Sequence, residues 1–83
     1  MKTAYTLVGQ DGNAFSLIDY AIEAMKDAYR EARKREDGEG IKRFGYEAQK
    51  ELLSQAFSSG YSNVICVCSA ACADVNDYLG LED

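Results

Sequence analysis

Three cysteines lie close together in the last third of the sequence, and clustered thiols can form a metal site. Cys66, Cys68 and Cys72 fall within one short stretch. A zinc site needs four ligands, usually cysteines and histidines in paired spacings, but the chain has no histidine and no fourth cysteine. An odd number of cysteines also makes no disulfide framework. We therefore expect no metal and no cofactor, and we predict that Cys68 and Cys72 fill space in the core.

Carboxylates are the second group that could carry chemistry. Asp19, Glu23 and Asp27 recur at steps of four, and paired carboxylates act as acid and base when one of them is buried. Lys26 and Arg30 each follow one of these acids by three residues, a spacing typical of ion pairs on an exposed helix face. Without histidine, the chain also lacks the usual general base. The sequence predicts a protein that is not an enzyme.

A loop near the start of the chain could bind an anion. It lies between a predicted strand and a predicted helix, where free backbone N–H groups hold phosphates in other proteins. The loop has neither the Gly-Lys-Ser/Thr of a phosphate-binding loop nor the three glycines of a dinucleotide fingerprint, and Asp11 would repel a phosphate. A turn that leads into a helix cap explains these residues better. A small-ligand or phosphate site stays the alternative, formed by Gly9, Asp11, Gly12 and Asn13.

Charge is uneven along the 83 residues, whose net charge is -5. Residues 26–43 hold most of the basic side chains, and residues 44–83 are strongly acidic. The acids interleaved with the basic cluster, and the negative total, argue against a nucleic-acid binder. No stretch is apolar enough to cross a membrane, and the start lacks the apolar core of a signal peptide, so we expect a cytoplasmic protein.

The elements that must position these residues form a single domain, residues 1–83, of the α+β class. We expect a short N-terminal strand over residues 3–8 and then three helices, giving the order β-α-α-α. The first helix begins at residue 13 and runs for roughly 20–24 residues, although Asp11-Gly12 could instead turn a hairpin. The second spans residues 41–58, with Gly60 as its C-terminal cap.

The third helix is expected between Ser62, as its cap, and Gly80. Residues 64–68 could instead form a second strand, because they are apolar and β-branched. Length favours the helix. Small residues on its far side, such as Cys66, Ala70 and Ala73, predict that it is buried on more than one side.

Two features of this arrangement predict contact with another chain. A lone strand leaves its backbone groups unpaired, and the second helix carries a second apolar ridge beside its core stripe. A symmetric dimer would satisfy both needs. We therefore expect a homodimer whose contact residues are Tyr5, Leu7, Tyr46, Leu53 and Phe57.

The start of the chain, Tyr5-Thr6-Leu7-Val8-Gly9-Gln10-Asp11-Gly12-Asn13-Ala14-Phe15, and the later Ser59-Gly60-Tyr61 give a resemblance. The chain resembles small phage and mobile-element proteins with a Y-x-L-V-G-x-D-G-N-A-F start. That group has no established activity, so the resemblance implies a genetic context and the β-α-α-α order only. The expected function is that of a small acidic protein-interaction module whose partner is unidentified. In a phage setting it could inhibit a host protein, as anti-CRISPR and anti-restriction proteins do.

Overall fold

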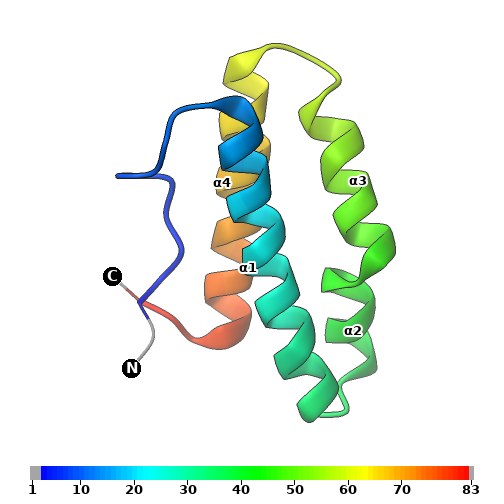
Figure 1. The fold of residues 1–83 in the computed structure, drawn as a ribbon. Helices are drawn as coiled ribbons and strands as arrows, with labels where there is room; N and C mark the ends of the chain where they lie inside the picture. Colours follow the sequence, from blue (N-terminus) through cyan, green and yellow to red (C-terminus); the bar gives the residue numbers. More distant parts are fainter. Residues whose placement is uncertain (1–2, 83) are drawn as a thin grey trace.

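The computed structural model describes residues 3–82, and every regular element in that range is a helix. The helices are α1 (Ala14–Lys34), α2 (Gly38–Phe44), α3 (Tyr46–Ala56) and α4 (Tyr61–Leu79). In Figure 1, α1 and α4 run side by side in the same direction, and α2 and α3 stack end to end and run back the other way. The predicted α+β class, with a strand before three helices, is therefore wrong for the described residues.

The first helix agrees closely with the sequence prediction. The Asn13 side chain caps α1 by accepting a hydrogen bond from the backbone N–H of Phe15 at 2.9 Å. Arg33 and Lys34 lie in the last turn, where positive charge stabilises the helix dipole. One face is buried along the whole length, because its apolar residues recur every three or four positions: Leu17, Ile18, Ala21, Ala24, Met25, Ala28 and Ala32.

The predicted second helix is in fact two helices, because the chain bends at Gly45. This residue has extended backbone angles, and a Cβ on it would lie 2.5 Å from the carbonyl oxygen of Ile41. Any side chain there would clash with the backbone, so the bend requires glycine. The remaining bounds also differ from the prediction: α2 begins at Gly38, and Gly60 caps the start of α4 in place of Ser62.

The third predicted helix is confirmed as α4, and the alternative of a strand over residues 64–68 is wrong. Val64, Cys68, Cys72 and Val75 are buried at helical spacing, which fixes the face that points to the core. Gly80 ends the helix with φ of 69°, a left-handed conformation that favours glycine.

Residues 3–8, here called the strap, belong to no helix and have no β partner among the described residues, and the chain begins to turn at Leu7. Figure 1 shows the strap on the side of α1 and α4 that faces away from α3. The Asn76 side chain accepts a hydrogen bond from the Tyr5 N–H and donates one to the Tyr5 carbonyl, both at 2.8 Å. The Tyr20 hydroxyl accepts from the Thr6 N–H at 2.9 Å. An asparagine amide offers the donor and acceptor of a peptide group, so Asn76 supplies hydrogen bonds that we expected a second copy of the chain to provide.

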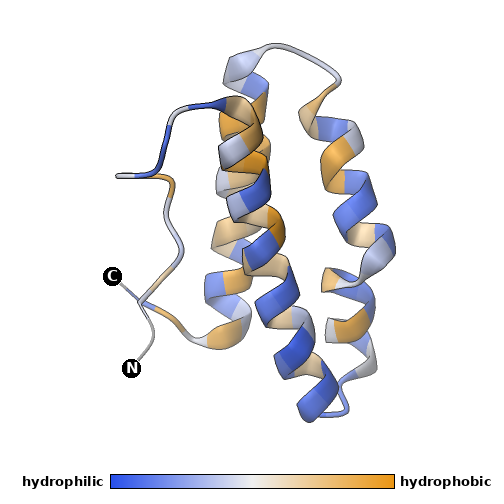
Figure 2. Cartoon of the chain, in the orientation of Figure 1, coloured by the Kyte–Doolittle hydropathy of each residue, from blue (hydrophilic) through white to orange (hydrophobic). Residues whose placement is uncertain are grey.

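The core lies where the helices meet, and α1 contributes the most to it. Phe44 and Leu52 come from the column of α2 and α3, and α3 packs more closely on α4 than on α1. Tyr5 and Leu7 cover the core from the strap. Hydrophobic and hydrophilic residues alternate along each helix in Figure 2, as expected when one side of a helix is buried. Within residues 3–82, no helix has the length and apolar character that a membrane span requires.

Candidate binding surfaces

The three cysteines all lie on α4, but they do not share one face of the helix. Cys68 and Cys72 are buried, as predicted, and Cys66 is exposed. Burial raises the pKa of the Cys72 thiol to about 11, with a smaller contribution from Cys68, and burial also raises the pKa of Cys68. A thiol that stays protonated is a poor nucleophile and a poor metal ligand. Among residues 3–82, no three acidic or cysteine side chains lie close enough together to hold a metal ion.

The carboxylates on α1 form ion pairs along its surface. Glu23 lies 3.6 Å from Lys26, and Asp27 lies 3.8 Å from Arg30. Asp27 differs from the prediction, because the strap partly covers it and the Tyr5 hydroxyl donates a hydrogen bond to it at 2.8 Å. These contacts give the carboxylates roles in surface pairing and in anchoring the strap.

The loop over residues 9–13 is tied together by its own polar groups. Asp11 accepts a hydrogen bond from the Asn13 N–H at 3.1 Å, and the Asn13 side chain accepts from Phe15. The Gly12 carbonyl accepts a hydrogen bond from the Tyr61 hydroxyl, which links the loop to α4. The N–H groups of Asn13 and Phe15, which an anion would use, therefore already have partners. Ligand binding at Gly9, Asp11, Gly12 and Asn13 stays a prediction.

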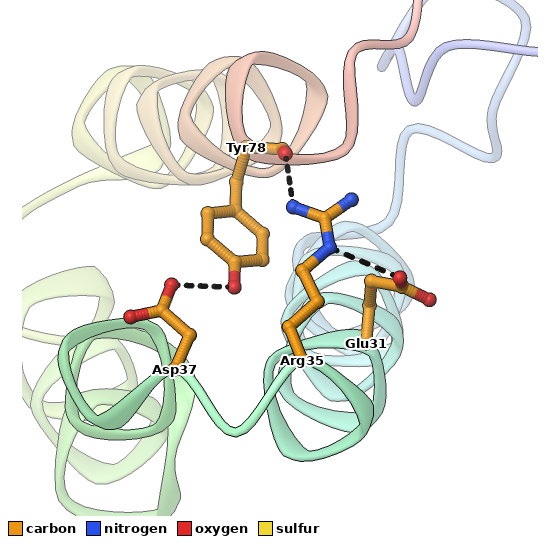
Figure 3. Close-up of polar contacts among 4 residues, drawn as sticks. All are labelled: Glu31, Arg35, Asp37 and Tyr78. Carbon is orange, nitrogen blue, oxygen red and sulfur yellow. Dashed lines mark hydrogen bonds and ion pairs between the residues drawn. The ribbon is translucent and has the colours of Figure 1, made fainter.

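A cluster of polar side chains joins the C-terminal end of α1 to α4 (Figure 3). The Tyr78 hydroxyl donates to Asp37 at 2.7 Å, and Arg35 bonds Glu31 at 3.0 Å and the Tyr78 carbonyl at 3.4 Å. The hydrogen bond from Tyr78 is the main cause of the lowered pKa of Asp37, and the same bond raises the pKa of Tyr78. A Cβ on Gly40 would lie only 2.6 Å from the Tyr78 hydroxyl. Sequence reasoning missed this cluster, because Asp37 and Tyr78 are 41 positions apart.

Large apolar side chains remain exposed along the seam between α1 and α3. Tyr46 and Leu53 share one face of α3, and Phe57, which caps the end of α3, continues that face; they are 74%, 39% and 56% exposed. Phe15 at the start of α1 is 66% exposed, and its ring centre lies 5.8 Å from that of Phe57. We call these four residues the aromatic ridge. Three of them belong to the predicted interface, and Phe15 was detectable because Phe15, Ile22 and Tyr29 repeat every seven residues on one helix face.

The other two predicted interface residues do not lie with these three. Tyr5 and Leu7 belong to the strap, on the opposite side of α1, and both are half-buried against the core. Their side chains and backbone are therefore used within the chain.

A groove of about 400 Å³ lies on the other flank of α3, between α3 and α4. Its floor is apolar and includes Met25 of α1 and Leu52 of α3. This groove corrects the prediction that α4 is buried on its far side, because Cys66 and Ala70 are exposed there. Small side chains leave space between two helices when no third helix fills it. The full lining comprises Met25, Arg43, Phe44, Ala48, Glu51, Leu52, Gln55, Cys66, Val67, Ala70, Ala71 and Asp74.

Comparison with known proteins adds no family to this description. No protein-family model, no curated protein and no solved structure matches this chain. The function has to be inferred from the surfaces themselves.

Proposed function

We propose that this protein is a non-catalytic protein-interaction module that pairs with a second copy of itself through the aromatic ridge. The ridge is the observation that carries the proposal, because four large apolar side chains lie exposed along one seam. A contiguous apolar patch on a small domain is typical of a protein–protein interface, and aromatic residues are enriched in such interfaces.

A second copy is the partner that the ridge fits best. A domain of this size buries a modest share of its apolar surface by itself, so further burial between two copies would add stability. A two-fold axis over the seam would place each ridge against the other, and every apolar residue would meet an apolar surface. Lys50 also lies in this row, and its aliphatic stem can cover apolar surface while its ammonium group stays in water.

Light scattering with a matched pair of variants tests the dimer. We expect the wild-type chain to reach twice its monomer mass of 9.1 kDa as concentration rises. Leu53→Glu places a charge inside the ridge and is expected to keep the protein monomeric. Ser54→Glu adds the same charge to an exposed position beside it and is expected to leave the dimer intact. A monomer at every accessible concentration, or equal effects of the two variants, would refute the ridge as a self-interface.

We further propose that the protein is encoded by a phage or mobile element and that its partner in the cell is a protein of the host. The support is the resemblance of residues 5–15 to small proteins of that origin. The gene neighbourhood provides the test. A position beside defence or anti-defence genes would support an inhibitor of the anti-CRISPR or anti-restriction kind, and a position inside a metabolic operon would count against it.

A further inference from the structure

We infer that the groove between α3 and α4 binds a cationic amphipathic helix of a partner protein. This site is separate from the proposed dimer interface. Leu53 of the ridge and Glu51 of the groove rim are two positions apart on α3, so their side chains leave the helix on opposite flanks. A dimer formed through the ridge would leave the groove open.

The walls and floor of the groove suit the apolar face of a helix. Phe44, Leu52 and Val67 give the floor aromatic and branched surface, and Met25 adds a flexible thioether side chain that adapts to different apolar groups. Ala48 and Ala70 keep the facing walls low, so another backbone can approach closely. The volume of about 400 Å³ lies within the range of roughly 300–1,000 Å³ for binding pockets. An open apolar groove between two helices is the receptor in the helix-in-groove mode of recognition.

The charges along the rims indicate a basic partner. Glu51 lines the groove on α3 and Asp74 lines it on α4, so carboxylates face the opening from both sides. Glu47 lies one turn before Glu51, and Asp77 lies one turn after Asp74. These four positions make the flanks of the groove acidic over more than one helical turn.

The basic residues near the groove offset only part of this charge. Arg43 lines the groove and lies 3.8 Å from Asp74, so it neutralises that carboxylate. The flanks stay net acidic because three carboxylates remain, those of Glu47, Glu51 and Asp77. Lys50, the one basic residue on α3, lies on the ridge flank. A partner helix with leucines at helical spacing and lysines on both edges of that apolar face would complement the floor and the rims together.

Titration with designed peptides tests the inference. The probe is a labelled leucine–lysine helix of about 18 residues, which makes five turns. Two peptides serve as controls, one with glutamate in place of lysine and one with alanine in place of leucine. Binding is followed by fluorescence anisotropy and by amide shifts of the full chain. We expect the leucine–lysine helix to bind much more tightly than either control and to shift the amides of Val67, Ala70 and Ala71.

Two variants with the same charge change locate the site. Ala70→Arg fills the groove from an exposed helical position, and we expect it to weaken binding at least about tenfold. Ser54→Arg adds the same charge to an exposed position of α3 that does not line the groove, and we expect less than about a threefold change. Circular dichroism melting checks that both variants fold.

Several results would overturn the inference. Equal binding of the leucine–glutamate helix, equal effects of the two variants, or shifts confined to the ridge would each do so. If dodecyltrimethylammonium matched the helix in affinity at the same residues, the groove would be a small-amphiphile site and no helix receptor. The Leu53→Glu variant separates the two proposals. Its charge lies on the ridge and outside the groove, so we expect peptide binding to be unchanged in this variant whether or not the ridge forms a dimer.

Discussion

The two seams of α1 differ, because one is covered by other parts of the chain and the other is open. On the side toward α4, the strap and the Tyr78 cluster cover the helices with polar contacts, and Asn76 satisfies both backbone groups of Tyr5. On the side toward α3, nothing in residues 3–82 covers the aromatic ridge, and Phe15 and Phe57 stay exposed. A polar group that becomes buried loses its hydrogen bonds to water and must gain a partner within the protein. Polar groups therefore determine which segment covers a seam. Apolar side chains need no hydrogen-bond partner, so they can stay exposed until another molecule covers them.

The first prediction contrasts the core with the open seam. Leu52 is buried and Leu53 is on the ridge. We expect Leu52→Ala to lower the free energy of unfolding by about 2–5 kcal/mol, as large-to-small core changes do. We expect Leu53→Ala to cost clearly less in the monomer, because Leu53 is already 39% exposed and loses less buried surface than Leu52 does. Urea unfolding at low protein concentration measures both. Equal losses would mean that the ridge is internal.

The second prediction breaks the closed seam. Asn76→Ala removes two hydrogen bonds to Tyr5, so we expect a loss of about 1–3 kcal/mol and faster hydrogen exchange at the Tyr5 amide. Asn63→Ala is the control, since Asn63 donates one bond to the Gln55 carbonyl at an exposed site and has no contact with the strap. If Tyr5 exchange were unchanged in Asn76→Ala, the strap would be held by its other contacts, which include the hydrogen bonds of Thr6 to Tyr20 and of Tyr5 to Asp27.

The third prediction concerns the turn between α1 and α2, at the end of the seam that the strap and the Tyr78 cluster cover. Glu36 has φ of 53°, the left-handed conformation usually taken by glycine after a helix, and the Asp37 N–H bonds the Ala32 carbonyl across this turn. We expect Glu36→Gly to raise the free energy of unfolding by up to about 1 kcal/mol, because the strain at this residue is relieved. Glu39→Gly, inside α2, is the control and is expected to destabilise. Thermal melting compares the two.

The smallest expected effect is a pH dependence at the Tyr78 cluster. The folded pKa of Asp37 is lowered, so its stabilisation is present above its unfolded pKa and is lost as pH falls below about 4. The folded pKa of Tyr78 is raised, so its contribution is present below its unfolded pKa and is lost as pH rises above about 10. We expect the stability difference between wild type and Tyr78→Phe to be constant near neutral pH and to shrink at both extremes. A difference that does not change with pH would show that the hydrogen bond to Asp37 does not form.

The sequence predicted the helices whose signals are local. For α1 and α4, the apolar period, the Asn13 cap and the Gly80 end all lie within the segment itself. The strap has a strand-like composition, but its conformation depends on Asn76, 71 positions away. The bend at Gly45 could not be predicted, because the need for glycine comes from the position of the Ile41 carbonyl after folding.

The binding surfaces divide in the same way. The ridge was largely predictable, because three exposed residues on α3 break the pattern of a helix with a single buried face. The groove was not, because it arises from small residues such as Ala48 and Ala70 on two helices, and small residues predict close packing as readily as open space.

The position of the strap also bears on how the chain folds. Its hydrogen bonds to Asn76 join residues near the two ends of the sequence, so the chain must close almost its full length before they form. The contacts among helices join nearer segments and can form earlier. We therefore expect the strap to dock after the transition state, so that its contacts slow unfolding and leave the folding rate almost unchanged. If the strap docks in this order, residues 3–8 affect the unfolding rate, and with it the lifetime of the folded protein, far more than the folding rate.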